Sequence, residues 1–346
     1  MNTIIEEDVQ KMTQAHLPWE SLDGKTVLIT GATGMLASYV TWLLLYLHRN
    51  RNVNVNVLAL CRTKETAEKY FGDYWGEPYF RLLIQDVCSP IDYDGDIHYI
   101  FHLAGNASPH FINSDPVGIM RCNLLGTINV LQLAHAKGNA KVIFASTREV
   151  YGRNDAADTL DEQSFGVIDT LDSRSCYPES KRAAETLLKS FSLQYGVPFN
   201  TIRIAHSYGP MMRLFGDGRI MADLMANVVE GSDIILKSDG SAVRAFIYET
   251  DAVLGIFYIV FWGDNNKAYN LANETEPITI KDLARMMATL RHGLQVSMQI
   301  SATGNQGYCA YKRKALDTSA VEALGWSPMV SLQNGIHRTF LSKTVL

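Results

Sequence analysis

Short apolar segments alternate with amphipathic segments over the first part of the chain. The short segments are bounded by turn residues, as in buried parallel strands, whereas the segments between them repeat their apolar positions with helical spacing. Lys181–Tyr195 has the clearest helical pattern. The alternation predicts an α/β fold with a doubly wound parallel sheet. The predicted strands are Thr26–Thr30, Val53–Leu60, Tyr79–Gln85, Tyr99–Leu103, Lys141–Ser146 and Asn200–Ala205.

The segments on either side of this region differ from it. Glu6–Glu20 reads as an amphipathic extension ahead of the first strand. Beyond Ala205 the segments are shorter and richer in Gly, Asp and Asn, which predicts a smaller second domain. The longest apolar runs, Tyr39–Leu47 and Ala252–Trp262, fall short of the ~20 residues that span a bilayer. Both runs are therefore expected to be core helices.

A glycine turn follows the first predicted strand directly. Its sequence, Gly31-Ala-Thr-Gly34-Met-Leu-Ala37, runs into the apolar segment Tyr39–Leu47. A strand, a glycine turn and a helix start form the context of a dinucleotide site in a Rossmann-type fold, because the glycines let backbone N–H groups approach a pyrophosphate. The residues predicted to bind the cofactor here are Gly31, Thr33, Gly34, Met35 and Leu36.

Tyr177 and Lys181 are four residues apart in a segment predicted to be helical. That spacing places both side chains on one helix face. A free tyrosine has a pKa near ~10 and is a poor base at neutral pH, but an adjacent ammonium favours the phenolate. The pair can therefore take a proton from a sugar hydroxyl while a nicotinamide takes the hydride.

The fifth predicted strand ends in the polar sequence Ser146-Thr147-Arg148-Glu149. In an open α/β sheet, ligands lie at the carboxyl ends of the strands. Ser146 is therefore expected beside the cofactor, and Thr147 and Glu149 are candidate catalytic residues.

These motifs, in this order, resemble those of the extended short-chain dehydrogenases/reductases. The resemblance covers nearly the whole chain from about Lys25 and points to the NAD-dependent nucleotide-sugar epimerase/dehydratase branch. It implies that the chain returns to the large domain at about Phe246–Leu271. The implied domains are an N-terminal extension, 1–21, a Rossmann domain, 22–203 plus about 246–272, and a nucleotide-sugar-binding domain, 204–245 plus 273–346.

The resemblance also implies further site residues. Additional cofactor contacts are expected from Asp86, Val87, Leu103, Ala104, Gly105 and Asn123, as well as from Tyr177 and Lys181. Within the branch, four segments look most like UDP-glucuronate decarboxylase: Ala107–Phe111, Arg174–Leu187, Asp217–Arg219 and Val243–Phe246. The residues expected to bind the nucleotide sugar are Ser108, Pro109, Arg148, Arg174, His206, Arg219 and Arg244.

Three positions depart from the decarboxylase pattern. Where this chain has Arg148, His206 and Met211, those enzymes usually have Ser, Asn and Arg, respectively. Nucleotide-sugar dehydratases commonly have an Asp–Glu pair after the threonine, and Arg148 interrupts that pair. We therefore rank decarboxylation above 4-epimerisation and 4,6-dehydration. A non-catalytic NAD(P)-binding regulator is the third reading, and the Tyr177–Lys181 pair argues against it.

The end of the second predicted strand bears on the choice of cofactor. An Asp there would bind the ribose 2′-hydroxyl, but the chain has Cys61 followed by Arg62. Arg62 could accept a 2′-phosphate or stack on adenine, which favours NADP weakly. The resemblance favours NAD, and NAD is the prediction, with NADP not excluded.

Composition agrees with a soluble enzyme, because 47% of the residues are hydrophobic and the net charge is −5. An acidic chain is not expected to bind nucleic acid or an anionic membrane. The five cysteines are scattered and odd in number, which favours reduced thiols in the cytoplasm. The histidines show no metal-ligand spacing, so no metal is predicted. A homodimer is expected from the resemblance alone.

Overall fold

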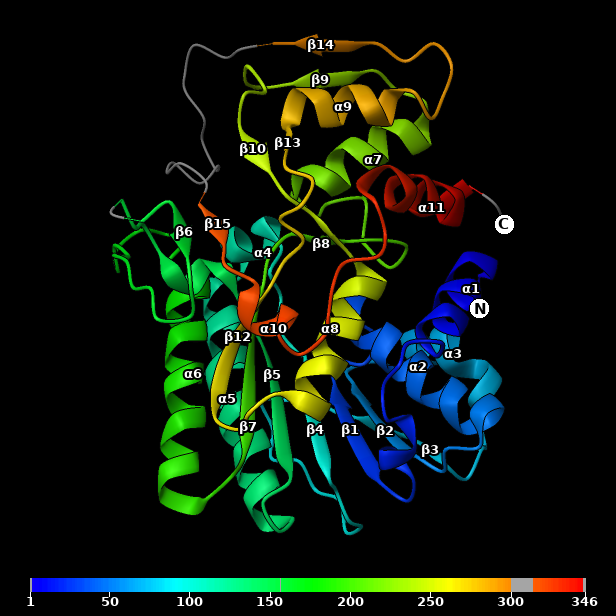
Figure 1. Cartoon of the computed structure of the whole chain (residues 1–346), viewed down its shortest axis with the longest axis vertical. Helices are drawn as coiled ribbons and strands as arrows, with labels where there is room; N and C mark the ends of the chain where they lie inside the picture. The colour runs from blue at the N-terminus through cyan, green and yellow to red at the C-terminus, as the bar shows by residue number, and fades with distance from the viewer. Residues whose placement is uncertain (1, 156, 300–313, 345–346) are drawn as a thin grey trace.

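The fold is built on a seven-stranded parallel sheet. In the computed structural model, which describes residues 2–155, 157–299 and 314–344, the strands lie in the order β12-β7-β5-β4-β1-β2-β3 (Figure 1). All six neighbouring pairs are parallel. The strands are β1 (Thr26–Thr30), β2 (Asn56–Cys61), β3 (Phe80–Ile84), β4 (Tyr99–His102), β5 (Lys141–Thr147), β7 (Phe199–Ile204) and β12 (Lys267–Leu271).

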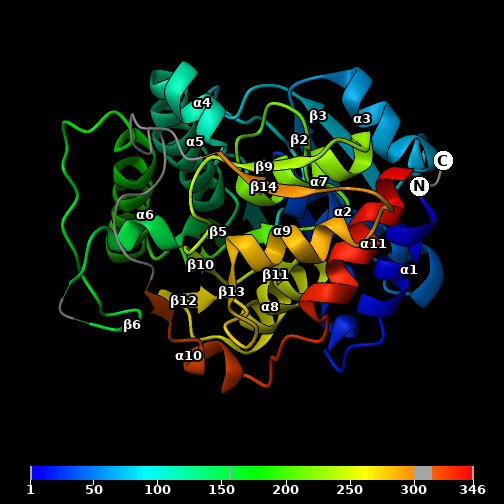
Figure 2. The same cartoon turned by 90° about the horizontal axis from the view of Figure 1, so that it is seen from above.

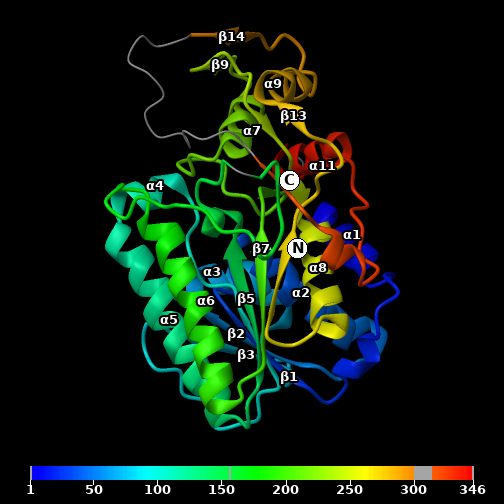
Figure 3. The same ribbon diagram turned by 60° about the vertical axis from the view of Figure 1, so that its left-hand side comes forward.

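Helices cover both faces of this sheet. Figure 3 shows α5 (Pro116–Ala136) and α6 (Cys176–Tyr195) on one face, with α2 (Met35–Arg51) and α8 (Glu249–Trp262) on the other. The two faces have separate apolar cores, and Phe71 of α3 (Lys64–Phe71) belongs to the core on the α2 side. The predicted α/β class and doubly wound sheet are confirmed.

All six predicted strands occur, with small shifts at their ends. The largest shift is in β2, which begins at Asn56 and not at Val53. Val53 and Val55 are buried, but they follow the left-handed C-cap residue Asn52 of α2 and lie in the connection. Burial without strand pairing explains why these residues resemble the start of a strand.

The helix predicted over Lys181–Tyr195 begins earlier than expected. α6 starts at Cys176, so Tyr177 and Lys181 both lie on it. Pro178 is in the first turn of α6, where backbone N–H groups have no acceptor within the helix. A proline, which lacks this N–H, is therefore tolerated there. The tyrosine and the lysine therefore share a helix, as their spacing predicts.

A smaller lobe lies over the carboxyl ends of the strands (Figures 1 and 2). Its helices are α7 (Ile220–Glu230), α9 (Ile280–Ala288) and α11 (Leu332–Thr344), and its strands are β9 (Ile234–Leu236), β10 (Val243–Arg244), β13 (Ile278–Thr279) and β14 (Val296–Met298). β9 pairs with β14 and β10 with β13. Between the lobe's segments, α8 and β12 return to the large sheet; the exact domain boundaries stay a prediction.

The remaining short elements connect the two parts. They are α4 (Pro109–Ser114), α10 (Ser319–Glu322), β6 (Thr159–Leu160), β8 (Ser207–Tyr208), β11 (Ile247–Tyr248) and β15 (Ala315–Leu316), with 3₁₀ turns at Trp19–Leu22, Gly72–Tyr74 and Arg148–Tyr151. β6 pairs with β15, which ties the loop after β5 to the C-terminal segment.

The N-terminal extension is helical and packs on the rest of the chain. α1 (Thr3–Met12) contacts α2, α8 and α11. Asp8 of α1 is 2% exposed and accepts hydrogen bonds from Tyr39 (2.9 Å), Tyr248 (2.7 Å) and Arg338 (2.9 Å). One buried carboxylate thus joins α1 and α11, near the two ends of the chain, to α2 and to the start of α8.

Two chain-wide properties complete the description. By length and apolar composition alone, α5 is the one helix within the described ranges that could cross a membrane; 44% of that window is buried, and core helices pass the same test. Cys61, Cys88, Cys122 and Cys176 are unpaired, and Cys309 lies outside the described residues.

Candidate active site

A cleft of about 1260 Å³ lies at the carboxyl ends of the parallel strands, under the smaller lobe. Residues following β1, β2, β4, β5 and β7 all line it. The predicted residues that line it are Gly31, Thr33, Gly34, Met35, Leu36, Arg62, Asp86, Val87, Leu103, Ala104, Gly105, Ser108, Pro109, Ser146, Thr147, Arg148, Glu149, Tyr177, Lys181, His206, Arg219 and Arg244. The two other predicted residues, Asn123 and Arg174, do not line the cleft, but each is close to a residue that does: Asn123 to Gly105, and Arg174 to Glu149.

The glycine turn forms a narrow cradle at one end of the cleft. Gly31 has φ +65°, and a Cβ on it would lie 2.8 Å from the Cα of Ala104. A Cβ on Gly34 would lie 3.0 Å from the carbonyl oxygen of Gly31. Gly34 then caps α2, so the N–H groups of the helix face this cradle. Backbone donors and the helix dipole together suit an anion such as a pyrophosphate.

A buried amide with one unused acceptor lies beneath the cleft, next to Gly105. Asn123 is 1% exposed; its Nδ2 donates to Ser180 Oγ (2.9 Å), whereas its Oδ1 has no hydrogen-bond partner within the described residues. A Cβ on Gly105 would lie 3.2 Å from that Oδ1 and 3.3 Å from Lys181 Nζ. A buried acceptor beside an ammonium and an open glycine fits a ligand with hydroxyl or amide donors. Together with the glycine cradle, it fits a nicotinamide dinucleotide.

Tyr177 and Thr147 meet where α6 faces the end of β5. Tyr177 is 5% exposed and lies beside the Thr147 side chain. Burial raises the pKa of the Tyr177 phenol well above its usual range; the Glu149 charge adds to this rise, and the Thr147 side chain opposes it. The hydroxyl is thus held protonated in a dry site.

The expectation that Lys181 lowers the pKa of Tyr177 directly is wrong for this structure. Lys181 Nζ donates to the carbonyl oxygen of Ala145 (2.7 Å) and lies over the Phe144 ring, 4.6 Å from its centroid. Burial lowers the pKa of the Lys181 ammonium to about 8. The ammonium is directed at the strand and the cleft floor, so it does not offset the desolvation of the phenol.

Glu149 brings a carboxylate to the same part of the cleft. Its N–H donates to Thr147 Oγ1 (3.2 Å), and its Oε2 lies 3.9 Å from Nη2 of Arg174. Burial raises the pKa of Glu149, and the charges of Arg174 and Arg148 oppose that rise. Arg148 Nη2 itself donates to the carbonyl oxygen of Lys314 (3.1 Å), toward the C-terminal segment.

Basic residues of the smaller lobe form the opposite wall. Arg219 makes a two-point ion pair with Asp217, with Nε to Oδ1 at 2.5 Å and Nη2 to Oδ2 at 2.9 Å. Ser108 Oγ donates to the carbonyl oxygen of Asp217 (2.5 Å), which links the two walls. His206 has a left-handed backbone, φ +49°, and its Nδ1 lies 3.2 Å from the carbonyl oxygen of Ala245. That contact requires the proton on Nδ1, because a carbonyl only accepts.

At the far end, Arg62 and Asp86 lie across the cleft from the smaller lobe. Both are exposed, and Cys61 before Arg62 is buried. A hydrogen bond from the N–H of Cys88 (2.8 Å) lowers the pKa of Asp86, and the Arg62 charge contributes to that shift. Arg62 and Asp86 therefore lie near each other in the cleft, and their role in binding adenosine stays a prediction.

Several lining residues have no counterpart in the sequence predictions. They include Arg121, Asp217 and Lys343. Lys343, near the end of α11, donates to the carbonyl oxygen of Met212 (3.0 Å). No motif surrounds Lys343, so only the tertiary fold reveals it. Asp217 could have been found from Asp217-Gly218-Arg219, because an Asp two residues before a predicted anion-binding Arg can pair with it.

The described residues contain no group of three His, Cys, Asp or Glu side chains that could hold a metal ion. The roles assigned to the site residues stay predictions. The structure adds that the glycine cradle, Tyr177, Lys181 and Thr147 line one cleft, with the buried acceptor of Asn123 directly beneath Gly105.

Comparisons with known proteins agree on the family. UDP-glucuronic acid decarboxylase 5 of Arabidopsis thaliana is 33% identical over 310 residues, which cover 90% of this chain and 86% of the relative. UDP-glucuronic acid decarboxylase 1 of Xenopus tropicalis is 31% identical, covering 95% of this chain and 75% of the relative. An epimerase structure from Methanothermobacter thermautotrophicus has a TM-score of 0.79 at 19% identity, covering 98% of this chain and 95% of that chain. The family model for NAD-dependent epimerases/dehydratases matches residues 27–272, so the chain belongs to the NAD-dependent epimerase/dehydratase family.

Proposed function

We propose that the protein is an NAD-dependent nucleotide-sugar decarboxylase that acts on UDP-glucuronate or a close relative. The observation that carries the proposal is the meeting of Tyr177, Thr147 and Lys181 at the end of β5, in a cleft with a dinucleotide cradle. The curated relatives reported above are named UDP-glucuronic acid decarboxylases, and they match 90% or more of this chain.

Tyr177, once it has given up its own proton, is the base that takes the proton of the sugar 4-hydroxyl, and Thr147 hydrogen-bonds the same oxygen and orients it. When bound, the nicotinamide accepts the hydride from carbon 4 and later returns it. Gly31, Gly34 and the start of α2 hold the pyrophosphate. Asn123 Oδ1 and Lys181 Nζ lie at the floor, where they suit the polar part next to the nicotinamide.

The 4-ketone turns a carboxylate at carbon 6 into part of a β-keto acid. The bond between carbons 5 and 6 breaks, carbon dioxide leaves, and the electron pair stays at carbon 5, which then takes a proton. Tyr177 finally returns its proton to the 4-oxygen. Arg174 is the cation that we assign to the carboxylate, because a guanidinium matches a carboxylate in a bidentate way.

The alternative is a 4-epimerase or 4,6-dehydratase on another nucleotide hexose. It uses the same Thr147, Tyr177 and Lys181 and differs in how the 4-keto intermediate reacts. Glu149 keeps this alternative open, because a carboxyl group with a raised pKa beside Tyr177 could assist elimination of water. A regulator that binds the cofactor without turnover is the third reading.

The finer assignments of location and assembly are proposals as well. We assign the protein to the cytoplasm, with its product used in polysaccharide biosynthesis. A homodimer through α5 and α6 would cover the apolar side chains that these helices expose, which include Val117, Met120, Leu125 and Leu193. Light scattering after gel filtration tests the dimer, and a monomer at micromolar concentration would contradict it.

The test of function is an incubation of purified protein with UDP-glucuronate and NAD⁺, followed by mass spectrometry. The expected product is lighter by one carbon dioxide, with no net NADH. Loss of water or epimerisation of neutral UDP- or dTDP-hexoses, without conversion of UDP-glucuronate, would support the alternative. Protein that binds NADH but converts none of these substrates would support the regulator.

A further inference from the structure

One face of α6 carries three residues at four-residue spacing, and each contacts the end of β5. Tyr177 lies beside the Thr147 side chain, which lowers the pKa of its phenol. One turn later, Lys181 Nζ donates to the carbonyl oxygen of Ala145 (2.7 Å). One turn further, Glu185 Oε1 accepts a hydrogen bond from Ser146 Oγ (2.5 Å). Residues four apart lie on one helix face, so α6 and β5 are joined along a single row.

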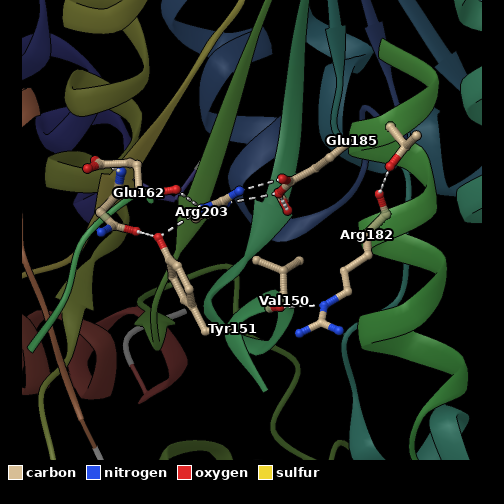
Figure 4. Close-up of polar contacts among 9 residues, drawn as sticks. Val150, Tyr151, Glu162, Arg182, Glu185 and Arg203 are labelled. Atoms are coloured by element: carbon tan, nitrogen blue, oxygen red, sulfur yellow. Dashed lines mark hydrogen bonds and ion pairs between the residues drawn. The ribbon is translucent and has the colours of Figure 1, made fainter. Parts of the chain in front are cut away.

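Glu185 has a second partner that fixes its position. Arg203 of β7 donates from Nε to Oε1 (3.1 Å) and from Nη2 to Oε2 (2.7 Å) of the same carboxylate, as Figure 4 shows. The two side chains are only 12% and 16% exposed. A two-point ion pair of this kind has a defined geometry, in contrast to an exposed pair.

Arg203 is itself held from the other side. Its Nη1 donates to the hydroxyl of Tyr151 (3.0 Å) and to the carbonyl oxygen of Glu162 (2.9 Å) (Figure 4). The Tyr151 hydroxyl in turn donates to Asn270 Oδ1 (2.6 Å) on β12. The ion pair therefore sits at the junction of α6, β5, β7, β12, the 3₁₀ turn that ends at Tyr151 and the segment that follows β6.

We propose that Glu185 and Arg203 are positioning residues for the reaction: their ion pair holds the row Tyr177–Lys181–Glu185 in register with Thr147, so that base and orienting hydroxyl face one substrate oxygen. Neither residue lines the cleft, so both act through Ser146, Lys181 and the strand end. This inference rests on the proposed function, because it assumes that Tyr177 and Thr147 act on the same hydroxyl.

The charge of Glu185 also acts on Lys181. Burial lowers the pKa of Lys181 to about 8, and the Cys122 thiol of α5 and the Glu185 carboxylate would each oppose this when ionised. Burial raises the pKa of Cys122, so Glu185 is the one of the two that is charged near pH 7. The other groups near it are His102 of β4, which is neutral near pH 7 because burial lowers its pKa to about 3, and Tyr177. Arg203 neutralises part of the Glu185 charge. Replacing Glu185 by a neutral residue should therefore lower the pKa of Lys181 further.

The first variant is Glu185→Gln, which keeps the size of the side chain and removes its charge. We expect kcat to fall about 10- to 100-fold, because a small misplacement of catalytic groups has an effect of this size. KM and the Kd for NADH should each change less than about threefold. The alkaline limb of the kcat–pH profile should move to lower pH, because Lys181 loses its proton more readily. NADH binding is measured by fluorescence titration, independently of turnover.

Asp8→Asn is the matched control. Asp8 also pairs with an arginine, Arg338, is buried, and accepts from tyrosine hydroxyls, but it lies between α1 and α11, away from Tyr177. It should lower Tm without moving the alkaline limb. If Glu185→Gln does the same, with a kcat loss that only follows the loss of folded protein, the positioning role is overturned.

Arg203→Lys keeps the proposal testable if Glu185→Gln does not fold. A lysine retains the charge but loses the two-point geometry, so a smaller loss of kcat is expected, with NADH binding retained. Wild-type kcat and an unshifted profile in a folded Arg203→Lys protein would contradict the proposal. If the wild-type protein shows no turnover, that result counts against the proposed function. The positioning role is judged separately, by comparing the turnover of each variant with that of the wild-type protein.

Discussion

Lys181 Nζ donates a 2.7 Å hydrogen bond to the carbonyl oxygen of Ala145, so the ammonium is fixed against β5 and not against the Tyr177 hydroxyl. The lysine thus contributes to the site in two ways. It holds α6 on the strand that carries Thr147, and it places a positive charge at the cleft floor beside Gly105. Burial raises the pKa of the Tyr177 phenol and so favours its protonated form.

Tyr177→Phe tests the proposed base. Removing the hydroxyl should lower kcat by at least ~10²-fold, the usual contribution of a general acid–base group, while NADH binding changes little. Turnover is measured by mass spectrometry, and binding by fluorescence titration. Tyr46→Phe is the control, since Tyr46 lies on α2 and does not line the cleft. Near-wild-type turnover of the Tyr177→Phe protein would remove Tyr177 from the mechanism.

Gly31→Ala tests the cofactor cradle. The methyl group would lie 2.8 Å from the Cα of Ala104, and the backbone there has φ +65°. We expect NADH affinity to fall at least ~10-fold, about 1.4 kcal/mol, because the turn must open to relieve the contact. Gly24→Ala is a matched control: Gly24 has φ +68°, but nothing lies within 4 Å of the added Cβ.

The Gly24→Ala protein should lose about 1 kcal/mol of stability from backbone strain and bind NADH normally. Equal loss of NADH affinity in the two variants would mean that strain alone, and not the cradle, explains the Gly31 effect.

Local patterns accounted for the parts of the site that are local in the chain. Gly31 and Gly34 could be recognised because strand, turn and helix are contiguous, and Tyr177 and Lys181 because one helix carries both. Contacts between distant segments could not be predicted in this way. The partner of Lys181, the carbonyl oxygen of Ala145, depends on how α6 docks on β5.

The same limit applies to the residues that support the site. Arg203 was predicted only as part of the strand Asn200–Ala205, yet its ion pair with Glu185 requires β7 and α6 to be adjacent. Lys343 reaches the cleft only because α11 packs against the smaller lobe and α1. Composition and periodicity contain no information on these pairings.

Arg174→Gln tests recognition of the sugar carboxylate. Arg174 Nη2 lies 3.9 Å from Oε2 of Glu149, which lines the cleft. Loss of its charge should raise KM for UDP-glucuronate by about 10-fold or more, because a carboxylate then loses its cation partner. Binding of UDP-glucose, which lacks the carboxylate, should change little. Competition titrations with both nucleotides measure the difference.

Arg153→Gln is the control for Arg174→Gln, because Arg153 pairs with Asp155 on the exposed surface. An equal loss of affinity for UDP-glucose and UDP-glucuronate in the Arg174→Gln protein would contradict the carboxylate assignment.

His102 predicts how stability depends on pH. Its Nδ1 lies 2.9 Å from Thr30 Oγ1 and its Nε2 lies 3.1 Å from Thr127 Oγ1. Thr127 donates to the carbonyl oxygen of Asn123, so it accepts from Nε2–H, and Nδ1 accepts from Thr30. Protonation would remove that acceptor. Burial accordingly lowers the pKa of His102 to about 3.

Between the ordinary pKa of histidine, near ~6.5, and about 3, the unfolded chain binds a proton at His102 that the folded chain does not. Stability therefore falls as the pH falls through this range, by up to about 1.4 kcal/mol per unit. His102→Gln should reduce the slope of unfolding free energy against pH between pH 6 and 4, measured by urea titration. Because carboxylates contribute to the slope in both proteins, the comparison is between slopes and not absolute stabilities. Identical slopes would mean that His102 takes up its proton in the folded state as readily as in the unfolded chain.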